Sequence, residues 1–575
     1  MGLAMILIVL LPCCPLLNGQ ISISQQEISY PAEEIRVHLS QTCLFPGEVM
    51  AFKIYCTNEL FPALEISRLA FIELVSDRNA SVLRKKILLE EGTGGGEFVL
   101  PDDMPTGIYT VVTYTNWLKN FGEDFFDRQH IMILNPDDVS VTDTCEAETD
   151  DLSCQQGSEG SHTGMTLQTD KEYYRTREKV TLKIVAGREG QSPAGGCFSI
   201  SAYRTEPAFY KSKYSVLNER KGIKAEEIRF LPDFNGIRLS GKLEKAGGSA
   251  IANSTVILSE PGPGTKIKHA GSDEKGNFHF LLSARGGEMD LVFTLPDEKT
   301  FLKLEEPFWN GLRNQAPHRT FCLNNQLLGF MVEKYDHYQL SKKFNLSTFS
   351  MHEQVTRNPE DSGRFYHNQS LLIRMDDYII LDSLPEYFYE LVPSVRYMHN
   401  RGDRTIRIVD PITGNMHKES PGVFVDGVLY SDYLEMARIP VQEIHDIAIL
   451  PELYYYHDFT FGGIIDLHTR NADFSSVPLL PNMTRLIYPL ASPQQTEFNR
   501  KAYPDTTISD RIPDFRYLIC WEPDIHLVDT AASTIYFYTG DVVGEFTVKL
   551  CGISSDGMIK EAQCRIFVQN PGTRP

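Results

Sequence analysis

The sequence lacks an excess of positive charge, since 55 Lys and Arg residues stand against 76 Asp and Glu residues, for a formal net charge of −21. Binding to nucleic acid requires a cationic face that neutralises phosphates, so no nucleic acid is expected as a partner. Hydrophobic residues make up 42% and charged residues 23% of the chain. This composition excludes disorder as the dominant state, and the length indicates about three to five domains.

Motifs for common catalytic and metal sites are also missing. The chain has no GxSxG elbow, no P-loop, no GxGxxG after a strand and no CxxC pair. The zinc-protease pattern His-Glu-x-x-His begins at His352 and Glu353 but lacks its second histidine, because Thr356 stands in that place. We therefore expect no enzyme activity, no cofactor and no metal site.

Long hydrophobic runs are absent after the first residues. Residues 1–17 form an apolar run that ends at Asn18-Gly19-Gln20, which predicts a signal peptide, residues 1–19, cleaved after Gly19. A short membrane anchor and a lipid-modified Cys13 or Cys14 are the alternatives, although the run is short of the roughly 20 apolar residues that span a bilayer. The protein is thus expected to be exported and either soluble or peripherally attached to a membrane.

Nine cysteines follow the predicted signal peptide, so at least one is unpaired. Cys145 and Cys154 flank a polar loop, and Cys551 and Cys564 bracket a turn between two strand-like runs. These two pairs are the disulfide candidates. Buried reduced thiols are an equally good interpretation of the other cysteines.

Abundant aromatic residues, with 32 Phe and 26 Tyr, together with 41 Gly and 32 Pro, favour strands separated by turns. The predicted fold class is mainly β, with tandem β-sandwiches and one small α+β domain. Two helices are expected, at 324–344 and 384–392. The boundaries follow shifts in composition: a β-sandwich at 20–136, an acidic linker at 137–164, a second sandwich at 165–235, a third at 236–299, an irregular and helical connector at 300–370, the α+β domain at 371–472, a linker at 473–509 and a C-terminal sandwich at 510–575.

The first predicted sandwich carries HLSQTCLFPGEVMAFKIYC (38–56), MPTGIYTVVTYTNWLKNFGEDFF (104–126) and IMILNP (131–136). These motifs resemble the macroglobulin-type β-sandwich of large Bacteroidetes envelope proteins. Pro46-Gly47 is expected to form a turn, and Trp117 is expected to pack across the sandwich. Residues 166–206 resemble a second, weaker copy.

In the third predicted sandwich, Asp273, Gly276 and Phe278 fill a D-x-x-G-x-F pattern between two strand-like runs. Segment 236–298 is therefore similar to the carboxypeptidase-regulatory type of β-sandwich. That module has no peptidase activity, so the resemblance implies a fold and no catalysis.

Three stretches of the α+β segment occur in a distinctive order: PGVFVDGVLY (421–430), IPVQEIHDIAIL (439–450) and FGGIIDLHTR (461–470). They resemble the plug domain of TonB-dependent outer-membrane receptors. Asp426-Gly427 predicts a hairpin turn, and Gly462-Gly463 belongs to the same plug-like motif. Only residues 471–575 follow, too few for the barrel of about 22 strands that encloses a receptor plug, so no pore is expected.

These resemblances imply a non-enzymatic exported envelope protein that assembles with an outer-membrane barrel or secretion complex through sheet edges and the plug-like domain. Cys197 lies outside any Gly-Cys-Gly-Glu-Gln thioester motif, so covalent protease trapping is not expected. One alternative is a glycan-active enzyme, which would need two carboxyl groups about 5–10 Å apart, such as Asp376 and Asp377. A protease-binding or adhesive surface protein is the other, with Arg401-Gly402-Asp403 as a weak indication of adhesion.

Overall fold

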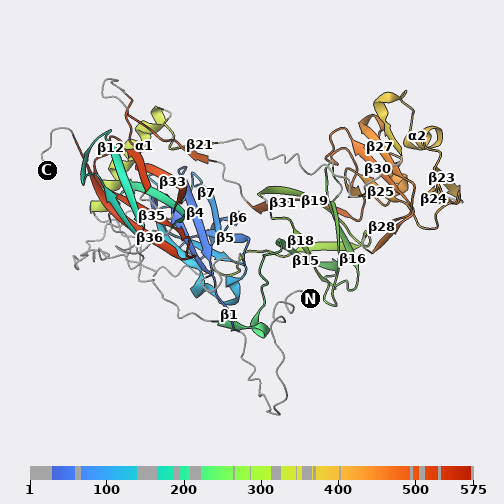
Figure 1. The fold of residues 1–575 in the computed structure, drawn as a ribbon, viewed down its shortest axis with the longest axis horizontal. Coiled ribbons are helices and arrows are strands. Elements are labelled where there is room, and N and C mark those ends of the chain that lie inside the picture. The colour runs from blue at the N-terminus through green and yellow to red at the C-terminus, as the bar shows by residue number, and fades with distance from the viewer. Residues whose placement is uncertain are drawn as a thin grey trace, which may run out of the picture.

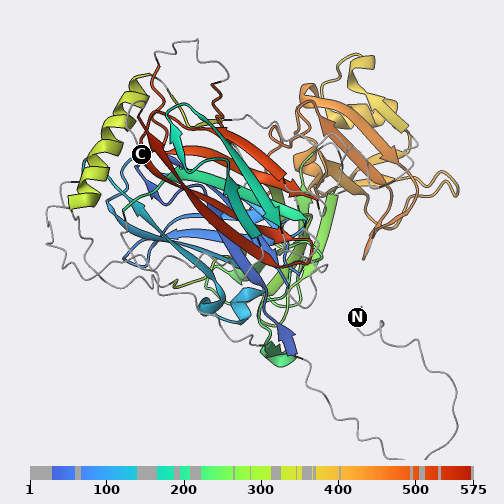
Figure 2. The same ribbon diagram turned by 60° about the vertical axis from the view of Figure 1, so that its left-hand side comes forward.

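The computed structural model describes residues 29–58, 66–138, 165–186, 195–207, 222–262, 264, 266–284, 286–312, 325–344, 346–351, 366, 371–400, 403–456, 458–491, 496–503, 512–528 and 533–570. The predicted signal peptide, Cys145, Cys154 and His352 lie outside these residues. The described part is mainly β, which confirms the predicted fold class. Figures 1 and 2 show two lobes, one with two sandwiches and a long helix, the other with a third sandwich and an α+β unit.

The first sandwich packs a sheet of three strands on a sheet of five. Its core contains Phe52, Phe98, Val111 and Tyr114, all almost fully buried. The predicted turn at Pro46-Gly47 is present, and Gly47 has a φ of +80°. The strands in sheet order are β2 (Glu34–Leu39), β4 (Val49–Thr57) and β7 (Thr93–Val99), then β3 (Cys43–Leu44), β9 (Asp127–Ile133), β8 (Gly107–Thr115), β5 (Leu69–Val75) and β6 (Ser81–Leu88).

Trp117 is buried, but it does not cross the sandwich as predicted. Its indole ring contacts Tyr30 and Phe121 edge to face, and its Nε1 donates to the Pro31 carbonyl at 3.0 Å. Tyr30 and Pro31 belong to β1 (Ser29–Pro31), which pairs with β14 (Gly222–Lys224). The tryptophan therefore anchors this small β-ribbon against the sandwich.

The second sandwich is built from two distant parts of the chain. Strand β13 (Gly196–Arg204) lies between β33 (Leu518–Leu527) and β35 (Gly544–Ser554). The separate sandwiches predicted at 165–235 and 510–575 are therefore wrong as independent units, because their strands complete one another. The remaining strands are β11 (Tyr173–Arg175) and β36 (Ile559–Gln569) in the same sheet, and β10 (Met165–Thr169), β12 (Lys179–Ala186) and β34 (Ser533–Tyr538) in the facing sheet.

The third sandwich also borrows a strand from outside its predicted boundary. Strand β31 (Met483–Ala491), in the segment predicted to be a linker, pairs with β19 (Gly287–Thr294) over eight residues. Asp273 accepts backbone N–H groups of Lys275 and Asn277, which forms the turn expected there. The other strands are β15 (Ile237–Lys245), β18 (Asn277–Leu282) and β20 (Thr300–Leu304) in one sheet, and β16 (Thr255–Glu260) and β17 (Lys266–Gly271) in the other.

The α+β unit has a five-stranded sheet with its own core of Val, Ile, Tyr and Phe side chains. The helix expected at 384–392 is α2 (Leu384–Leu391). The sheet order is β22 (Leu371–Arg374), β27 (Ile444–Leu450), β30 (Ile464–Thr469), β25 (Gly422–Val425) and β26 (Val428–Leu429). Two hairpins, β23 (Val395–Asn400) with β24 (Asp403–Ile408) and β28 (Tyr454–Tyr456) with β29 (Phe459–Phe461), and helix α3 (Tyr433–Met436) complete the unit.

The connector carries the helix expected at 324–344 as α1 (Asn325–Lys343). Leu327 and Phe330 bury against the second sandwich, and Lys334 donates to the Cys43 carbonyl of the first at 2.7 Å. None of the described helices is long and apolar enough to cross a membrane. The short elements are β21 (Phe349–Met351), which pairs with β32 (Thr496–Phe498), and the 3-10 helices η1 (Leu118–Asn120), η2 (Glu123–Phe125), η3 (Ala225–Glu227), η5 (Met375–Asp377) and η6 (Val441–Glu443).

The shared second sandwich predicts how truncation affects the fold. A chain that ends at residue 510 loses both neighbours of β13, so the backbone groups of that strand have no ladder partners. We expect 165–204 to become sensitive to protease, while the first sandwich stays resistant, as read by limited proteolysis with mass spectrometry. A chain that ends at residue 570 is the control. A resistant fragment covering 165–204 in the shorter chain would contradict the shared architecture.

Candidate functional site

The plug-like turn residues lie where the sequence predicts a hairpin. Asp426 and Gly427 have φ values of +46° and +81° and connect β25 to β26 in a two-residue turn. The Asp426 side chain is buried and accepts three hydrogen bonds, from the Thr469 N–H at 2.7 Å, the Thr469 hydroxyl at 2.6 Å and the Phe474 N–H at 2.9 Å. Its carboxylate thus fixes the end of β30 and the loop that follows.

The glycines of the same motif permit close packing. A Cβ atom on Gly462 would lie 2.3 Å from the Glu419 carbonyl oxygen, and one on Gly463 would lie 2.7 Å from the Ile408 side chain. The Asp426 carbonyl accepts the Gly262 N–H at 2.9 Å, so the turn faces the third sandwich. All four motif residues therefore stabilise the fold of the α+β unit and its contact with the third sandwich. Their polar groups and close packing serve the structure.

A charged cluster links β27 and β30 inside the α+β unit. His468 Nδ1 lies 2.9 Å from Asp446 Oδ1, and His468 Nε2 lies 3.4 Å from Asp466 Oδ2. The Tyr366 hydroxyl donates to Asp466 at 2.6 Å. Burial would lower the pKa of His468, but the hydrogen bonds and charges of Asp446 and Asp466 outweigh it and raise the pKa to about 9. An imidazolium between two carboxylates stabilises the sheet at neutral pH.

Asp376, one of the two carboxylates considered for glycan hydrolysis, lacks the environment of a general acid. Asp376 Oδ1 lies 2.7 Å from Arg470 Nη2, and this hydrogen bond, followed by the guanidinium charge, holds the pKa of Asp376 below its ordinary value. A general acid in a glycosidase needs a raised pKa. Asp376 is thus committed to an ion pair with Arg470.

A serine and a histidine meet where the first two sandwiches pack together. His38 Nδ1 lies 2.6 Å from the Ser199 hydroxyl and Nε2 lies 2.9 Å from the Ser201 hydroxyl. Burial lowers the pKa of His38 far below its ordinary value. All three side chains are fully buried, so no substrate can reach Ser199. The contact joins the sandwiches and has no access for hydrolysis.

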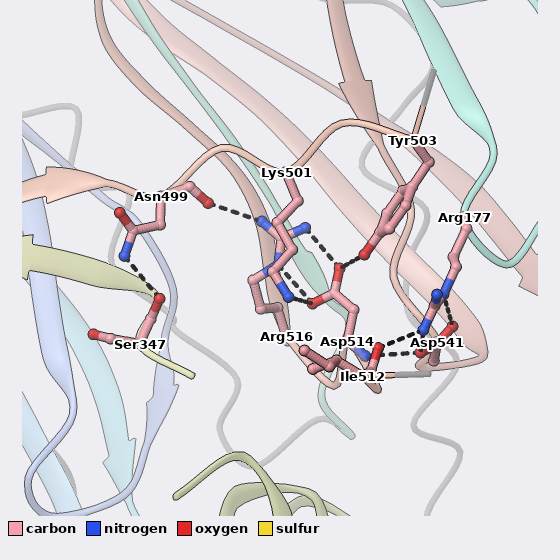
Figure 3. Close-up of polar contacts among 9 residues, drawn as sticks. All are labelled: Arg177, Ser347, Asn499, Lys501, Tyr503, Ile512, Asp514, Arg516 and Asp541. Carbon is pink, nitrogen blue, oxygen red and sulfur yellow. Dashed lines mark hydrogen bonds and ion pairs between the residues drawn. The ribbon is translucent and has the colours of Figure 1, made fainter. Parts of the chain in front are cut away.

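A polar network around Asp514 and Arg516 joins the segment before β33 to the second sandwich (Figure 3). The Arg516 guanidinium donates to both Asp514 oxygens at 2.7 and 2.8 Å, and the Tyr503 hydroxyl donates to Asp514 Oδ2 at 2.8 Å. Burial opposes ionisation of Asp514, but Arg516 outweighs it, so the pKa of Asp514 is below its ordinary value. Arg177 and Asp541 form a second ion pair at 2.7 Å. These groups saturate one another and provide structure.

The described cysteines are all free thiols: Cys43, Cys56, Cys197, Cys520, Cys551 and Cys564. The predicted bond between Cys551 and Cys564 is therefore wrong. In the ladder of β35 and β36, Cys551 faces Glu561 and Cys564 faces Val548. Cys551 and Val548 are three positions apart, so the two thiols project from opposite faces of the sheet. Cys145 and Cys154 lie outside the described residues, so their bond stays a prediction.

Among the described residues no cluster of three or more His, Cys, Asp or Glu side chains could hold a metal ion.

A group of exposed apolar side chains is the feature that the sequence analysis missed. Among the described residues, the five large hydrophobic side chains with the highest exposure, between 69% and 87%, all belong to the α+β unit. The run Tyr378-Ile379-Ile380 between aspartates was the available sequence signal. We call the five residues the exposed apolar set: Ile379, Ile380, Tyr389, Ile412 and Tyr455.

The sequence matches no protein-family model and no curated protein. Solved structures similar to the chain include an alpha-2-macroglobulin of Salmonella, at 10% identity and a TM-score of 0.24, over 95% of this chain and 40% of that chain. An alpha-2-macroglobulin of Escherichia coli activated by porcine elastase has 9% identity and a TM-score of 0.23, over 94% and 44%. The adhesin InvE of Yersinia pseudotuberculosis has 8% identity and a TM-score of 0.13, over 50% and 64%. The chain spans about two fifths of the macroglobulins, and these TM-scores carry no inference about function.

The buried pair of Asp514 and Arg516 predicts a large loss of stability for Asp514→Ala. The change leaves the Arg516 guanidinium buried without its carboxylate, so we expect the free energy of unfolding to fall by about 3–5 kcal/mol. Urea titration followed by tryptophan fluorescence, to which the buried Trp521 of β33 contributes, measures this loss. The double variant Asp514→Leu, Arg516→Met is the control, and its free energy of unfolding should fall by less than that of the single variant. Equal losses in both variants would contradict the role of the unpaired charge.

The raised pKa of His468 predicts a pH dependence of the α+β unit. Because the folded pKa of about 9 exceeds the unfolded value of 6.5, the stabilisation is complete below pH 6.5 and is lost as pH rises through 9. This difference between the folded and unfolded pKa corresponds to a loss of about 3 kcal/mol. Hydrogen exchange of β27 and β30, corrected for intrinsic rates, should show the loss. This loss of protection at high pH should be absent in His468→Gln and retained in the control His526→Gln, which changes an exposed histidine. A loss that persists in His468→Gln would contradict the assignment.

Proposed function

We propose that this protein is a non-enzymatic exported envelope protein that binds a partner protein through its α+β unit, while the three sandwiches serve as a rigid scaffold. The partner is a component of an outer-membrane transport or secretion complex. The observation that carries the proposal is the exposed apolar set, five large hydrophobic side chains that the α+β unit leaves in water. Large exposed apolar groups gathered on one small unit are typical of interaction surfaces.

The scaffold role is supported by how firmly the sandwiches are joined. One continuous apolar cluster runs from Phe52 and Tyr114 of the first sandwich to Leu258 and Phe293 of the third. The ammonium group of Lys86 lies 3.9 Å from the centre of the Tyr488 ring across the same contact. A large hydrophobic contact limits the relative motion of domains. The α+β unit is therefore presented on a stiff support, which reduces the entropy lost on binding.

The polar groups of the described residues favour binding over catalysis. Asp376, His38 and Asp514 are each held by partners that stabilise a single charge state or leave no access to a substrate. A catalytic acid or base would instead need access and a pKa near the working pH. The chemistry of these groups thus supports a protein that acts by contact.

Affinity purification from detergent-solubilised envelopes tests the proposal. The full chain should recover a membrane protein complex, and serine in place of all five residues of the exposed apolar set should reduce recovery about tenfold or more. Exposed side chains contribute little to folding, so stability should change by less than about 0.5 kcal/mol per site. The control carries serine at Leu281, Phe301 and Val528, which are exposed on the sandwiches.

Three results would overturn the proposal. If the protein is recovered alone, it has no partner in the envelope. If the five-residue variant and the control recover the same amount of partner, the α+β unit is not the binding site. Turnover of a glycan or peptide from a substrate panel would favour an enzyme. Recovery of a protease or a host-surface protein in place of an outer-membrane complex would favour the protease-binding or adhesive alternative.

A further inference from the structure

One part of the α+β unit combines exposed isoleucines with a run of acidic residues. Ile379 and Ile380 are 82% and 71% exposed and follow Tyr378, which is 46% exposed. These three residues, called the apolar tip, connect η5 to α2. Isoleucine is among the most frequently buried residue types. Two adjacent isoleucines in water therefore indicate a surface that another molecule covers.

The tip is held in place by buried side chains on either side of it. The hydroxyl of Tyr387, a fully buried residue of α2, donates to the Ile379 carbonyl at 3.1 Å and accepts the Leu381 N–H at 3.2 Å. Met375 before the tip and Leu384 after it are both in the core of the unit. The backbone of the tip is therefore preorganised, so a partner that buries the isoleucines pays little ordering entropy.

The surroundings of the tip carry negative charge. Asp377, Asp382, Glu386 and Glu390 are exposed, and the chain has no Lys, Arg or His between Met375 and Val395. On α2, Glu386 and Glu390 share one face with Tyr389, because residues three and four apart are neighbours on a helix. Asp376 is the exception, since Arg470 neutralises it.

We propose that the apolar tip and the outer face of α2 bind a protein segment whose apolar side chains are flanked by Lys or Arg. This assignment rests on the proposed function and names the chemistry of the partner. The isoleucines would supply the apolar contact, and the four carboxylates would attract the basic residues and set their register. Anionic lipid headgroups would be repelled by the carboxylates. A second copy of the same face would bring like charges together.

Synthetic peptides of equal length and defined composition test the assignment with the purified full chain. One alternates Lys with Leu, a second replaces Leu by Ser, and a third replaces Lys by Glu. Fluorescence anisotropy should show binding of the Lys/Leu peptide at least about tenfold tighter than that of the other two. The double variant Ile379→Ser, Ile380→Ser should weaken binding of the Lys/Leu peptide at least about tenfold. Phe301→Ser, at an exposed position of the third sandwich, should leave it within about twofold.

Charge variants separate the tip from the general negative charge of the chain. The double variant Glu386→Gln, Glu390→Gln should weaken binding of the Lys/Leu peptide and reduce the salt dependence of that binding. Glu274→Gln, at an exposed turn of the third sandwich, should change neither. Equal effects of the tip and control variants would overturn the assignment. Binding of the Glu/Leu peptide, or tip-dependent binding to phosphatidylglycerol vesicles, would do the same.

The envelope purification separates this assignment from the proposed function. If the five-residue variant loses the partner while the Ile379→Ser, Ile380→Ser variant retains it, the partner binds elsewhere on the α+β unit and only the assignment fails. If the full chain recovers no partner, the proposed function itself fails. Loss of the partner with the double variant, together with the peptide result, supports both.

Discussion

Strand β13 imposes the constraint on which the rest of the architecture depends. It is an inner strand of a five-stranded sheet, and its two neighbours, β33 and β35, come from the far end of the chain. A buried strand cannot leave its backbone groups unpaired. The third sandwich and the α+β unit are therefore inserted between β13 and β33, and the chain returns to the first lobe after them (Figure 1). Helix α1, the ribbon of β21 and β32, and the ion pair of Asp514 and Arg516 lie along this route and hold it in place.

Local structure could be predicted from the sequence because it depends on neighbouring residues. The strand-like run that follows the turn of Asp273 and Gly276 is β18, and the two helices expected at 324–344 and 384–392 are α1 and α2. The pairing of β13 with β33 and β35 could not be predicted, because alternation determines which face of a strand is buried and leaves its neighbour open. The same reason explains why β31 was predicted to be linker. For Cys551 and Cys564, nearness in sequence suggested a bond that the ladder register excludes.

The residues singled out by resemblance and the residues of the exposed apolar set are different sets. Asp426, Gly427, Gly462 and Gly463 satisfy backbone geometry and close packing, which is why they form recognisable motifs. The exposed apolar set has no such local constraint. Burial is the expectation for isoleucine, so the exposure of Ile379 and Ile412 depends on the tertiary fold and could not be predicted from residue type.

The split second sandwich also has a consequence for biosynthesis. As the chain emerges from the ribosome, β10, β12 and β13 appear long before β33 to β36 are made. Until then these strands have open edges, which are templates for aggregation. Their pairing with strands far along the chain is a contact of large sequence separation, which slows folding. A nascent chain of this design therefore keeps strand edges open for longer than an array of self-contained modules would.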